Sequence, residues 1–318
     1  MAKPVITVFG ATGAQGGGLV RALLGDTDRH FAVRAVTRKP DSAVARALAQ
    51  AGAQVVLADL DDGASVQRAL EGAYGAFFVT NFWEHMSAEK ELAQAHTLAA
   101  AAAQAGIHHA IWSTREDTRE FLPADGSRMP VLQQRFNVPQ FDAKGEAHRF
   151  FAQQRVPVTY LYPSCYWENL IRFGMGPLRR WNGGLELIFP FGAARIPWMA
   201  ADDIGVAARE IFLRGDALVY ESIGVAGEFL TGAELARQLT GVLGEEVVYK
   251  DLSPDAFRAL AFPGARELGN MFQFKRDFEA EYCARRDLKR SRALHPEMAD
   301  FATWLKLHGS RIPVALAA

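Results

Sequence analysis

The chain has 318 residues, of which 49% are hydrophobic and 22% are charged, as in ordinary globular proteins. With 35 basic and 36 acidic residues, its formal net charge of −1 gives no electrostatic basis for binding nucleic acid or a membrane surface. The two cysteines, Cys165 and Cys283, are too few for a disulfide framework or a thiolate zinc site. The first residues run directly into a predicted strand and no apolar run is long enough to span a bilayer, so we expect a cytoplasmic protein.

Strand and helix patterns alternate through the first half of the chain. Predicted strands cover residues 4–9, 31–37, 54–57, 75–79, 109–112 and 158–162. Predicted helices begin after residue 18 and cover residues 42–51, 64–70, 87–105 and 140–154. This alternation with short connections predicts a parallel sheet that is covered by helices on both faces. The fold class is therefore α/β, with a Rossmann-type doubly wound parallel sheet.

The pattern changes after residue 162. Helical stretches near residues 169–180, 202–213, 232–243, 254–261 and 297–308 alternate with short β-prone runs at 185–189, 218–223 and 246–250. We expect a smaller α+β C-terminal lobe, built from residues 163–200 and 225–318. Residues 1–162 would form the nucleotide-binding Rossmann domain, to which residues 201–224 would return.

A glycine-rich turn joins the first predicted strand to the helix that follows it. Gly10, Gly13 and Gly16 have the spacing G-x-x-G-x-x-G, which lets the backbone approach a ligand while the helix N-terminus presents free N–H groups to an anion. Because a strand precedes the turn and a helix follows it, the turn predicts a dinucleotide diphosphate site. The cofactor contacts expected here are Gly10, Thr12, Gly13, Ala14, Gln15 and Gly16.

The end of the second predicted strand indicates which dinucleotide binds. An NAD site normally carries an acidic residue there, which binds the ribose 2′-OH. Here the strand ends at Thr37, and the cations Arg38 and Lys39 follow. Both can pair with a 2′-phosphate, Arg38 through its planar fork, so NADP(H) is favoured over NAD(H). The alternative is a pair of solvated surface charges.

Further cofactor contacts are expected where other strands end, because ligands of doubly wound sheets lie at the carboxyl ends of the strands. The adenine would border the residues after the third strand, and the diphosphate and ribose would lie along those after the fourth. These predicted contacts are Asp59, Leu60, Thr80, Asn81 and Phe82. Ser113, after the fifth strand, would face the nicotinamide or only cap the strand end.

Lys144 is the candidate catalytic residue. Short-chain dehydrogenases place a tyrosine acid four residues before such a lysine, but this position holds Gln140, which cannot act as a general acid. Lys144 would bind the nicotinamide ribose, or act alone if burial lowers its pKa; the alternative is an exposed helix lysine. The histidines lack metal-ligand spacing and no G-x-S-x-G motif occurs, so we expect neither a metal site nor a hydrolase.

An aromatic loop at residues 162–169 follows the sixth predicted strand. It would wrap the nicotinamide end of the cofactor, although packing between lobes explains its aromatic residues equally well. The cofactor contacts expected here are Tyr166, Glu168 and Asn169. Cys165 would be redox-sensitive if exposed, whereas a buried cysteine more commonly acts as a small hydrophobe.

Six runs, spread in order over nearly the whole chain, carry a family resemblance. They are residues 8–17, 37–39, 79–84, 141–146, 165–170 and 262–272. These runs resemble the NmrA-like family of atypical short-chain dehydrogenase/reductases, and most of all its HSCARG-type redox-sensor branch. The resemblance implies an NADP(H)-binding Rossmann domain with a small C-terminal lobe. It also implies that many members regulate partners in response to the NADPH/NADP+ balance without clear dehydrogenase activity.

The resemblance also implies site residues by position. The implied cofactor contacts are Gly10, Gly13, Gln15, Gly16, Arg38, Lys39, Thr80, Asn81, Lys144 and the loop at Tyr166. Two departures limit this transfer: residues 113–139 show little similarity, and Tyr162 stands where relatives often have arginine. The proline-containing run 113–139 is also long for a connection, which is typical of a functional or mobile loop, and its ordering on cofactor binding is a hypothetical switch.

Two functions remain open at this point. The first is a cytosolic NADP(H) sensor that reports the cofactor state to a protein partner, which the missing tyrosine acid favours. The second is an NADPH-dependent reductase of a small quinone, enone or aromatic carbonyl that uses Lys144 alone, as isoflavone-reductase-like relatives do. Phe82, Trp83, Tyr166 and Trp167 would suit such a substrate. A DNA-binding regulator has no basic helix or stripe to support it, and we expect no nucleic-acid contact and no membrane.

Overall fold

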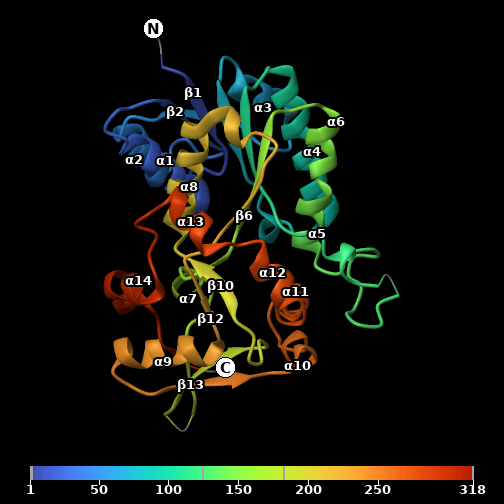
Figure 1. The fold of residues 1–318 in the computed structure, drawn as a ribbon, viewed down its shortest axis with the longest axis vertical. Coiled ribbons are helices and arrows are strands. Elements are labelled where there is room, and N and C mark those ends of the chain that lie inside the picture. The colour runs from blue at the N-terminus through green and yellow to red at the C-terminus, as the bar shows by residue number, and fades with distance from the viewer. Residues whose placement is uncertain (1–2, 124, 182, 317–318) are drawn as a thin grey trace. The chain divides into compact units, whose positions relative to one another are not determined.

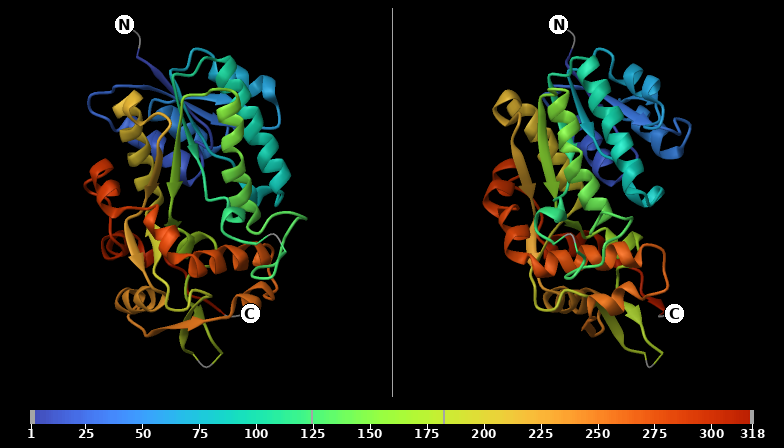
Figure 2. Two further views of the ribbon diagram at one scale, coloured as in Figure 1. Left: turned by 45° about the vertical axis from the view of Figure 1, so that its right-hand side comes forward. Right: turned by 90° about the vertical axis from the view of Figure 1, so that its right-hand side faces the viewer.

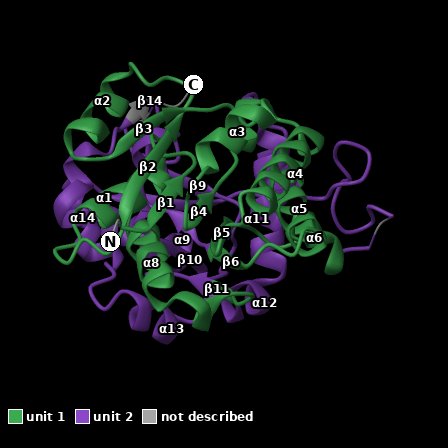
Figure 3. Ribbon diagram, turned by 90° about the horizontal axis from the view of Figure 1, so that it is seen from above, with its two compact units in different colours: residues 1–121, 139–162, 202–223 green, residues 122–138, 163–201, 224–318 purple. Residues whose placement is uncertain are grey.

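The computed structural model describes residues 3–123, 125–181 and 183–316. In it the chain forms two compact units, each assembled from separate parts of the sequence (Figure 3). Unit 1 comprises the described parts of residues 1–121, 139–162 and 202–223, and unit 2 those of residues 122–138, 163–201 and 224–318. No helix in the described ranges combines the length and the apolar character that a membrane crossing needs.

Unit 1 is built on a seven-stranded sheet (Figure 1) with the order β11-β6-β5-β4-β1-β2-β3 (Figure 3). Its strands are β1 (Val5–Val8), β2 (Ala32–Thr37), β3 (Gln54–Leu57), β4 (Gly75–Phe78), β5 (His109–Ser113), β6 (Val158–Pro163) and β11 (Ser222–Val225). The neighbouring pairs from β6 to β3 run parallel. The strand order reverses between β1 and β4, where doubly wound sheets bind their ligands. The predicted doubly wound parallel sheet is thus confirmed.

Helices cover both faces of this sheet (Figures 2 and 3). One face carries α1 (Ala14–Leu24), α2 (Ala43–Gln50) and α8 (Ala201–Arg214), and the other α3 (Gly63–Leu70), α4 (Ala88–Gln104), α5 (Pro139–Glu146) and α6 (His148–Gln153). Ser42, Asp62 and Ser87 cap α2, α3 and α4 with side-chain oxygens, which explains why these helices begin where they do. The single helix predicted over residues 140–154 is instead two, α5 and α6, interrupted at Ala147.

Unit 2 contains two small sheets and seven of the described α-helices. The sheets have the orders β12-β10-β7 and β13-β9-β8-β14. Their strands are β7 (Cys165–Tyr166), β8 (Leu178–Arg179), β9 (Leu185–Phe189), β10 (Ile196–Met199), β12 (Glu228–Leu230), β13 (Val247–Asp251) and β14 (Ala315–Leu316). The helices are α7 (Asn169–Arg172), α9 (Gly232–Leu243), α10 (Pro254–Arg258), α11 (Ala265–Asp277), α12 (Glu279–Ala284), α13 (Leu288–Leu294) and α14 (Phe301–His308). The smaller α+β part predicted toward the C-terminus is therefore confirmed.

The helix predicted over residues 169–180 is wrong beyond Arg172. Gly174 has a φ of +65°, in the left-handed region that helices do not continue through. A Cβ on Gly176 would lie 2.6 Å from the carbonyl oxygen of Leu170, so the chain folds back tightly here before it enters β8. The two glycines therefore allow the chain to leave the helical path after a single turn of α7.

The connection between β5 and α5, predicted as one loop over residues 113–139, is divided between the two units. Its first part is tied to α5 within unit 1, where the Thr118 N–H and Oγ1–H donate to Oδ1 of Asp142 at 2.8 and 2.6 Å. Its later part belongs to unit 2 and lies beside α11 (Figure 2). There the side-chain amide of Asn270 donates to the carbonyl oxygen of Asn137 at 2.6 Å. Each part is thus held by its own buried hydrogen bonds.

Within unit 1, α8 approaches α1 so closely that only glycine fits at the contact. A Cβ on Gly205 would lie 2.1 Å from the carbonyl carbon of Gly18 and 2.3 Å from the nitrogen of Leu19. We expect Gly205→Ala to lower the free energy of unfolding by about 1–3 kcal/mol, because the two helices must separate. Urea unfolding measures this change. Gly241→Ala in α9 is the matched control, since its Cβ position has no atom within 4 Å apart from the neighbouring backbone of its own helix. Equal stability of the two variants would contradict the close contact.

Candidate functional site

The glycine turn between β1 and α1 satisfies three separate constraints. Gly10 has a φ of +65°, and a Cβ on it would lie 2.6 Å from Cγ1 of Val79. A Cβ on Gly16 would lie 2.4 Å from the carbonyl oxygen of Gly10, so this glycine allows the helix to pack on the strand. Gly13 is exposed, and a Cβ on it would lie 3.3 Å from the carbonyl oxygen of Gly10. Gly10 and Gly16 are therefore needed by the fold itself, whereas Gly13 leaves an exposed backbone at the start of α1.

The start of α1 leaves N–H groups for an anion. Its N-cap residue, Gly13, makes no side-chain cap, and no acidic residue lies in the first turn. The first N–H groups of a helix have no partner inside it, and they form the positive end of the helix dipole. Gly10 and Thr12 are exposed, and Ala14 and Gln15 are half-buried. This open backbone cradle fits a dinucleotide diphosphate.

A direct contact links the turn to the end of β5. Ser113 Oγ donates to Oε1 of Gln15 at 2.6 Å, across 98 residues of sequence. Ser113 is 1% exposed, so this bond also satisfies a buried hydroxyl. The structure therefore brings together two of the predicted contact residues from opposite sides of β4.

Arg38, which follows β2, is paired with an acidic residue. Its guanidinium hydrogen-bonds to Oε1 of Glu84, on the short helix η1 (Phe82–Glu84) that follows β4, and this bond raises the pKa of Arg38. The side chains are 53% and 45% exposed, so the pair is accessible to solvent and sensitive to salt. Glu84 therefore holds the guanidinium that we predict for the 2′-phosphate, and a phosphate would have to displace it. Lys39 is exposed beside it.

The other contacts predicted at strand ends of unit 1 differ in exposure. Asp59 and Leu60 are half-buried, and Oδ1 of Asp59 accepts the backbone N–H of Asp61 at 3.0 Å, which turns the chain after β3. Asn81 is exposed just before η1. Phe82 is 2% exposed, so its ring belongs to the core, and its contact with the cofactor stays a prediction.

Lys144 lies in a buried cluster with Thr80 and Glu91, which we call the Lys144 cluster. Its Nζ donates to Oε1 of Glu91 at 2.7 Å, to Oγ1 of Thr80 at 2.5 Å and to the carbonyl oxygen of Thr80 at 3.1 Å. The Thr80 hydroxyl in turn donates to Oε1 of Glu91 at 2.6 Å. The Lys144 side chain is 12% exposed and that of Glu91 is fully buried. An ammonium has three N–H donors, so every donor of Lys144 faces an acceptor inside unit 1.

Burial and charge act in opposite directions on the pKa of Lys144. Desolvation lowers its pKa, and the charge and hydrogen bond of Glu91 oppose that shift only in part. His85 supplies a second polar neighbour to Glu91. Its Nδ1 accepts the N–H of Ser87 at 3.2 Å, which leaves the ring hydrogen on Nε2, 3.5 Å from Oε2 of Glu91. Glu91 is therefore the central group of the cluster.

Three elements position the Lys144 cluster. Thr80 follows β4, Glu91 lies in the first turn of α4 and Lys144 lies in the last turn of α5. The indole N–H of Trp112 and the hydroxyl of Thr114 both donate to the carbonyl oxygen of Lys144, at 3.1 and 3.0 Å, which ties α5 to the end of β5. Sequence reasoning missed Glu91. An acidic residue in the first turn of a helix is ordinarily explained by the helix dipole, so the sequence carries no separate signal of its burial.

The three contacts predicted after β6 lie in unit 2. Tyr166 is half-buried in β7, and Asn169 begins α7. Both carboxylate oxygens of Glu168 are used inside this unit, since Oε2 accepts the N–H of Ala201 at 2.9 Å and Oε1 accepts the indole N–H of Trp304 at 3.0 Å. Glu168 therefore holds unit 2 together, and the cofactor contacts of this loop stay a prediction.

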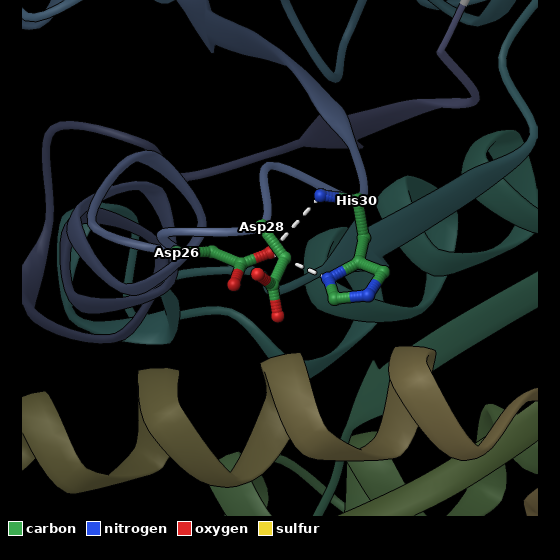
Figure 4. Close-up of side chains that lie close together, drawn as sticks. All are labelled: Asp26, Asp28 and His30. Atoms are coloured by element: carbon green, nitrogen blue, oxygen red, sulfur yellow. Dashed lines mark hydrogen bonds and ion pairs between the residues drawn. The ribbon is translucent and has the colours of Figure 1, made fainter.

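One polar cluster in the described residues has metal-ligand spacing, in the turn between α1 and β2. Single ligand atoms of Asp26, Asp28 and His30 lie within 4.8 Å of one another (Figure 4). Oδ2 of Asp26 accepts both the backbone N–H of His30 at 3.0 Å and a hydrogen bond from its ring Nδ1 at 2.8 Å (Figure 4). The backbone bond, more than the ring, lowers the pKa of Asp26. These bonds account for the cluster as a turn, and we assign no metal to it.

Similar proteins are known both by sequence and by structure. The NmrA-like family domain-containing oxidoreductase FrzB of Cladobotryum sp is 28% identical over 302 residues, which cover 88% of this chain and 86% of FrzB. The crystal structure of NmrA, a negative transcriptional regulator, in complex with NADP matches with a TM-score of 0.76 and 24% identity over 96% of this chain and 94% of that one. The triphenylmethane reductase of Citrobacter sp., complexed with NADP(H), matches with a TM-score of 0.74 and 18% identity over 95% of this chain and 99% of that one.

At these identities the two solved structures show a shared fold. The profile of the NmrA-like family extends over residues 2–305, nearly the whole chain. The family predicted from the six sequence runs is thus confirmed, whereas its HSCARG-type branch stays a prediction. The chain belongs to the NmrA-like family.

Proposed function

We propose that this protein binds NADP(H) in unit 1 and acts as a cytoplasmic sensor or regulator that reports the state of the cofactor to a protein partner. One observation carries the choice of a sensor over an enzyme. All three Nζ donors of Lys144 are bound by Thr80 and Glu91, so none is directed to a substrate. Gln140, at the position of the missing tyrosine acid, is buried and cannot supply the proton.

The residues expected to hold the cofactor lie at the carboxyl ends of the strands of unit 1. The turn at residues 10–16 would bind the diphosphate, and Arg38 and Lys39 the 2′-phosphate. The adenine would lie by Asp59 and Leu60, and the ribose and nicotinamide by Asn81 and Ser113. They would lie beside the Lys144 cluster, in which Nζ would have to leave Thr80 to bind the ribose. When bound, NADP(H) supplies hydride chemistry; this chain's residues bind and orient it. The solved NADP complexes of NmrA and triphenylmethane reductase support this class of cofactor.

A reductase is the second candidate, acting on a small quinone, enone or aromatic carbonyl. One observation favours it: burial lowers the pKa of Lys144, which makes it a stronger acid than an exposed lysine. The oxidoreductase name of FrzB and the shared fold of triphenylmethane reductase point in the same direction. In this case the Lys144 cluster would have to open so that Nζ reaches the substrate.

A panel of quinones and enones with NADPH separates the two functions. For a sensor, we expect NADPH oxidation at the background rate in the wild type, together with saturable NADPH binding measured by fluorescence. The test variant is Glu91→Gln/Lys144→Met, which removes both buried charges together and so avoids leaving one unpaired. Lys289→Met, at an exposed position in α13, is the matched control. Steady turnover that the double variant loses, while it still binds NADPH, would reject the sensor and establish the reductase.

A further inference from the structure

We propose that Cys165 and Lys275 form a covalent bond when the protein is oxidised, which makes this pair a modification site of unit 2. Nζ of Lys275 lies 2.9 Å from Sγ of Cys165, although 110 residues separate them in the sequence. Lys275 is 3% exposed and Cys165 is 8% exposed. An amino group and a sulfur atom are thus held in contact inside the protein.

Secondary structure fixes both ends of this contact. Cys165 lies in β7, where it pairs in register with Trp198 of β10, and Lys275 lies near the end of α11. Two aromatic rings lie near the amino group, whose nitrogen is 5.7 Å from the ring centre of Phe272 and 5.6 Å from that of Tyr282. The amino group is therefore held beside the sulfur by α11 on one side and β7 on the other.

The chemistry needs one equivalent of a hydroperoxide. The thiolate is the form of cysteine that attacks peroxides. With hydrogen peroxide, the sulfur of Cys165 gives two electrons to the O–O bond, which breaks and yields a sulfenic acid and one water. The Lys275 amine, once deprotonated, then attacks the sulfur; the S–N bond forms, the S–O bond breaks and the hydroxyl leaves as a second water with the remaining proton. The protein loses two hydrogen atoms and the peroxide becomes two waters.

Cys283 provides a control within the same unit. Burial, helped by Glu279, raises the pKa of this thiol to about 11, so little of it is thiolate at neutral pH. Its Sγ donates to the carbonyl oxygen of Arg195 at 3.3 Å. We therefore expect Cys283 to react slowly with peroxide and to form no link to a lysine.

The test treats the full-length protein with hydrogen peroxide and maps the tryptic peptides by mass spectrometry. We expect residues 156–172 to be joined to residues 267–276, at a mass about 2 Da below the sum of the two peptides, because two hydrogens are lost. Cleavage after Lys275 should be blocked, and dithiothreitol should restore the separate peptides. Since the link closes a loop of 110 residues, the oxidised protein should also melt several degrees higher.

Two variants make the assignment specific. Cys283→Ala should form the link as the wild type does. Lys275→Arg keeps the positive charge but lacks a nucleophilic amine, so its reaction should stop at a sulfenic acid that dimedone traps. The proposal is overturned if the linked peptide contains Cys283 instead of Cys165, or if Cys165 proceeds to sulfinic acid in the wild type while trypsin still cleaves after Lys275.

Discussion

Replacement of Arg38 by alanine should abolish the preference of this protein for NADPH over NADH. Hydrogen bonds to charged groups contribute about 1.5–3 kcal/mol, so we expect NADPH affinity to fall roughly 10- to 100-fold while NADH affinity is unchanged. Fluorescence or calorimetric titration of both dinucleotides at fixed, low salt measures the two affinities. Arg68→Ala, at an exposed position in the last turn of α3, is the matched control and should alter neither affinity.

Because Arg38 is paired with Glu84, the same titration can be made with a variant of Glu84. Because the carboxylate competes with the 2′-phosphate for the guanidinium, Glu84→Gln should bind NADPH several-fold more tightly at low salt. That gain should shrink as salt is added, since both groups are exposed. Equal losses of NADPH and NADH affinity in Arg38→Ala would show that Arg38 supports the fold of the site and does not read the phosphate.

Removal of the Glu91 carboxylate should strongly destabilise the protein. Glu91→Ala leaves the buried Lys144 without its counter-charge, and breaking a buried ion pair on one side typically costs about 3–5 kcal/mol. Urea unfolding at neutral pH, monitored by circular dichroism, measures this loss. Glu89→Ala, at an exposed position of the same helical turn, should change stability by less than about 0.5 kcal/mol.

The pH dependence of the stability of Glu91→Ala tests whether the unpaired charge of Lys144 causes the loss. Without Glu91, desolvation of Lys144 is no longer opposed, so its folded pKa falls further below the unfolded value of about 10.4. The unfolded state then binds more protons between these two pKa values, so the stability of the variant relative to wild type should rise as the pH increases toward about 10.4. Adding Lys144→Met to Glu91→Ala should recover much of the loss at neutral pH. A deficit that is independent of pH, and is not recovered, would assign the effect to lost packing.

Several elements could be predicted to the residue because their signals are local. α9 has its predicted bounds, since Thr231 and Glu234 form a capping box at its start and Gly244 ends it with a φ of 69°. The strand β9 also has its predicted bounds. Helix α11, in contrast, was not predicted. Its buried positions include Asn270, Gln273 and Lys275, so polar residues interrupt the apolar period by which a core-facing helix is recognised.

The sequence by itself determined the doubly wound sheet, the glycine turn at the start of α1 and membership of the NmrA-like family. Each rests on patterns within short stretches, where periodicity and turn chemistry act between neighbours in the chain. Only the tertiary structure decided the partners of the charged and reactive groups: Glu84 for Arg38, Glu91 for Lys144 and Lys275 for Cys165. The physical reason is that a buried polar group is compensated by whatever the fold places against it, and those partners lie far away in the sequence.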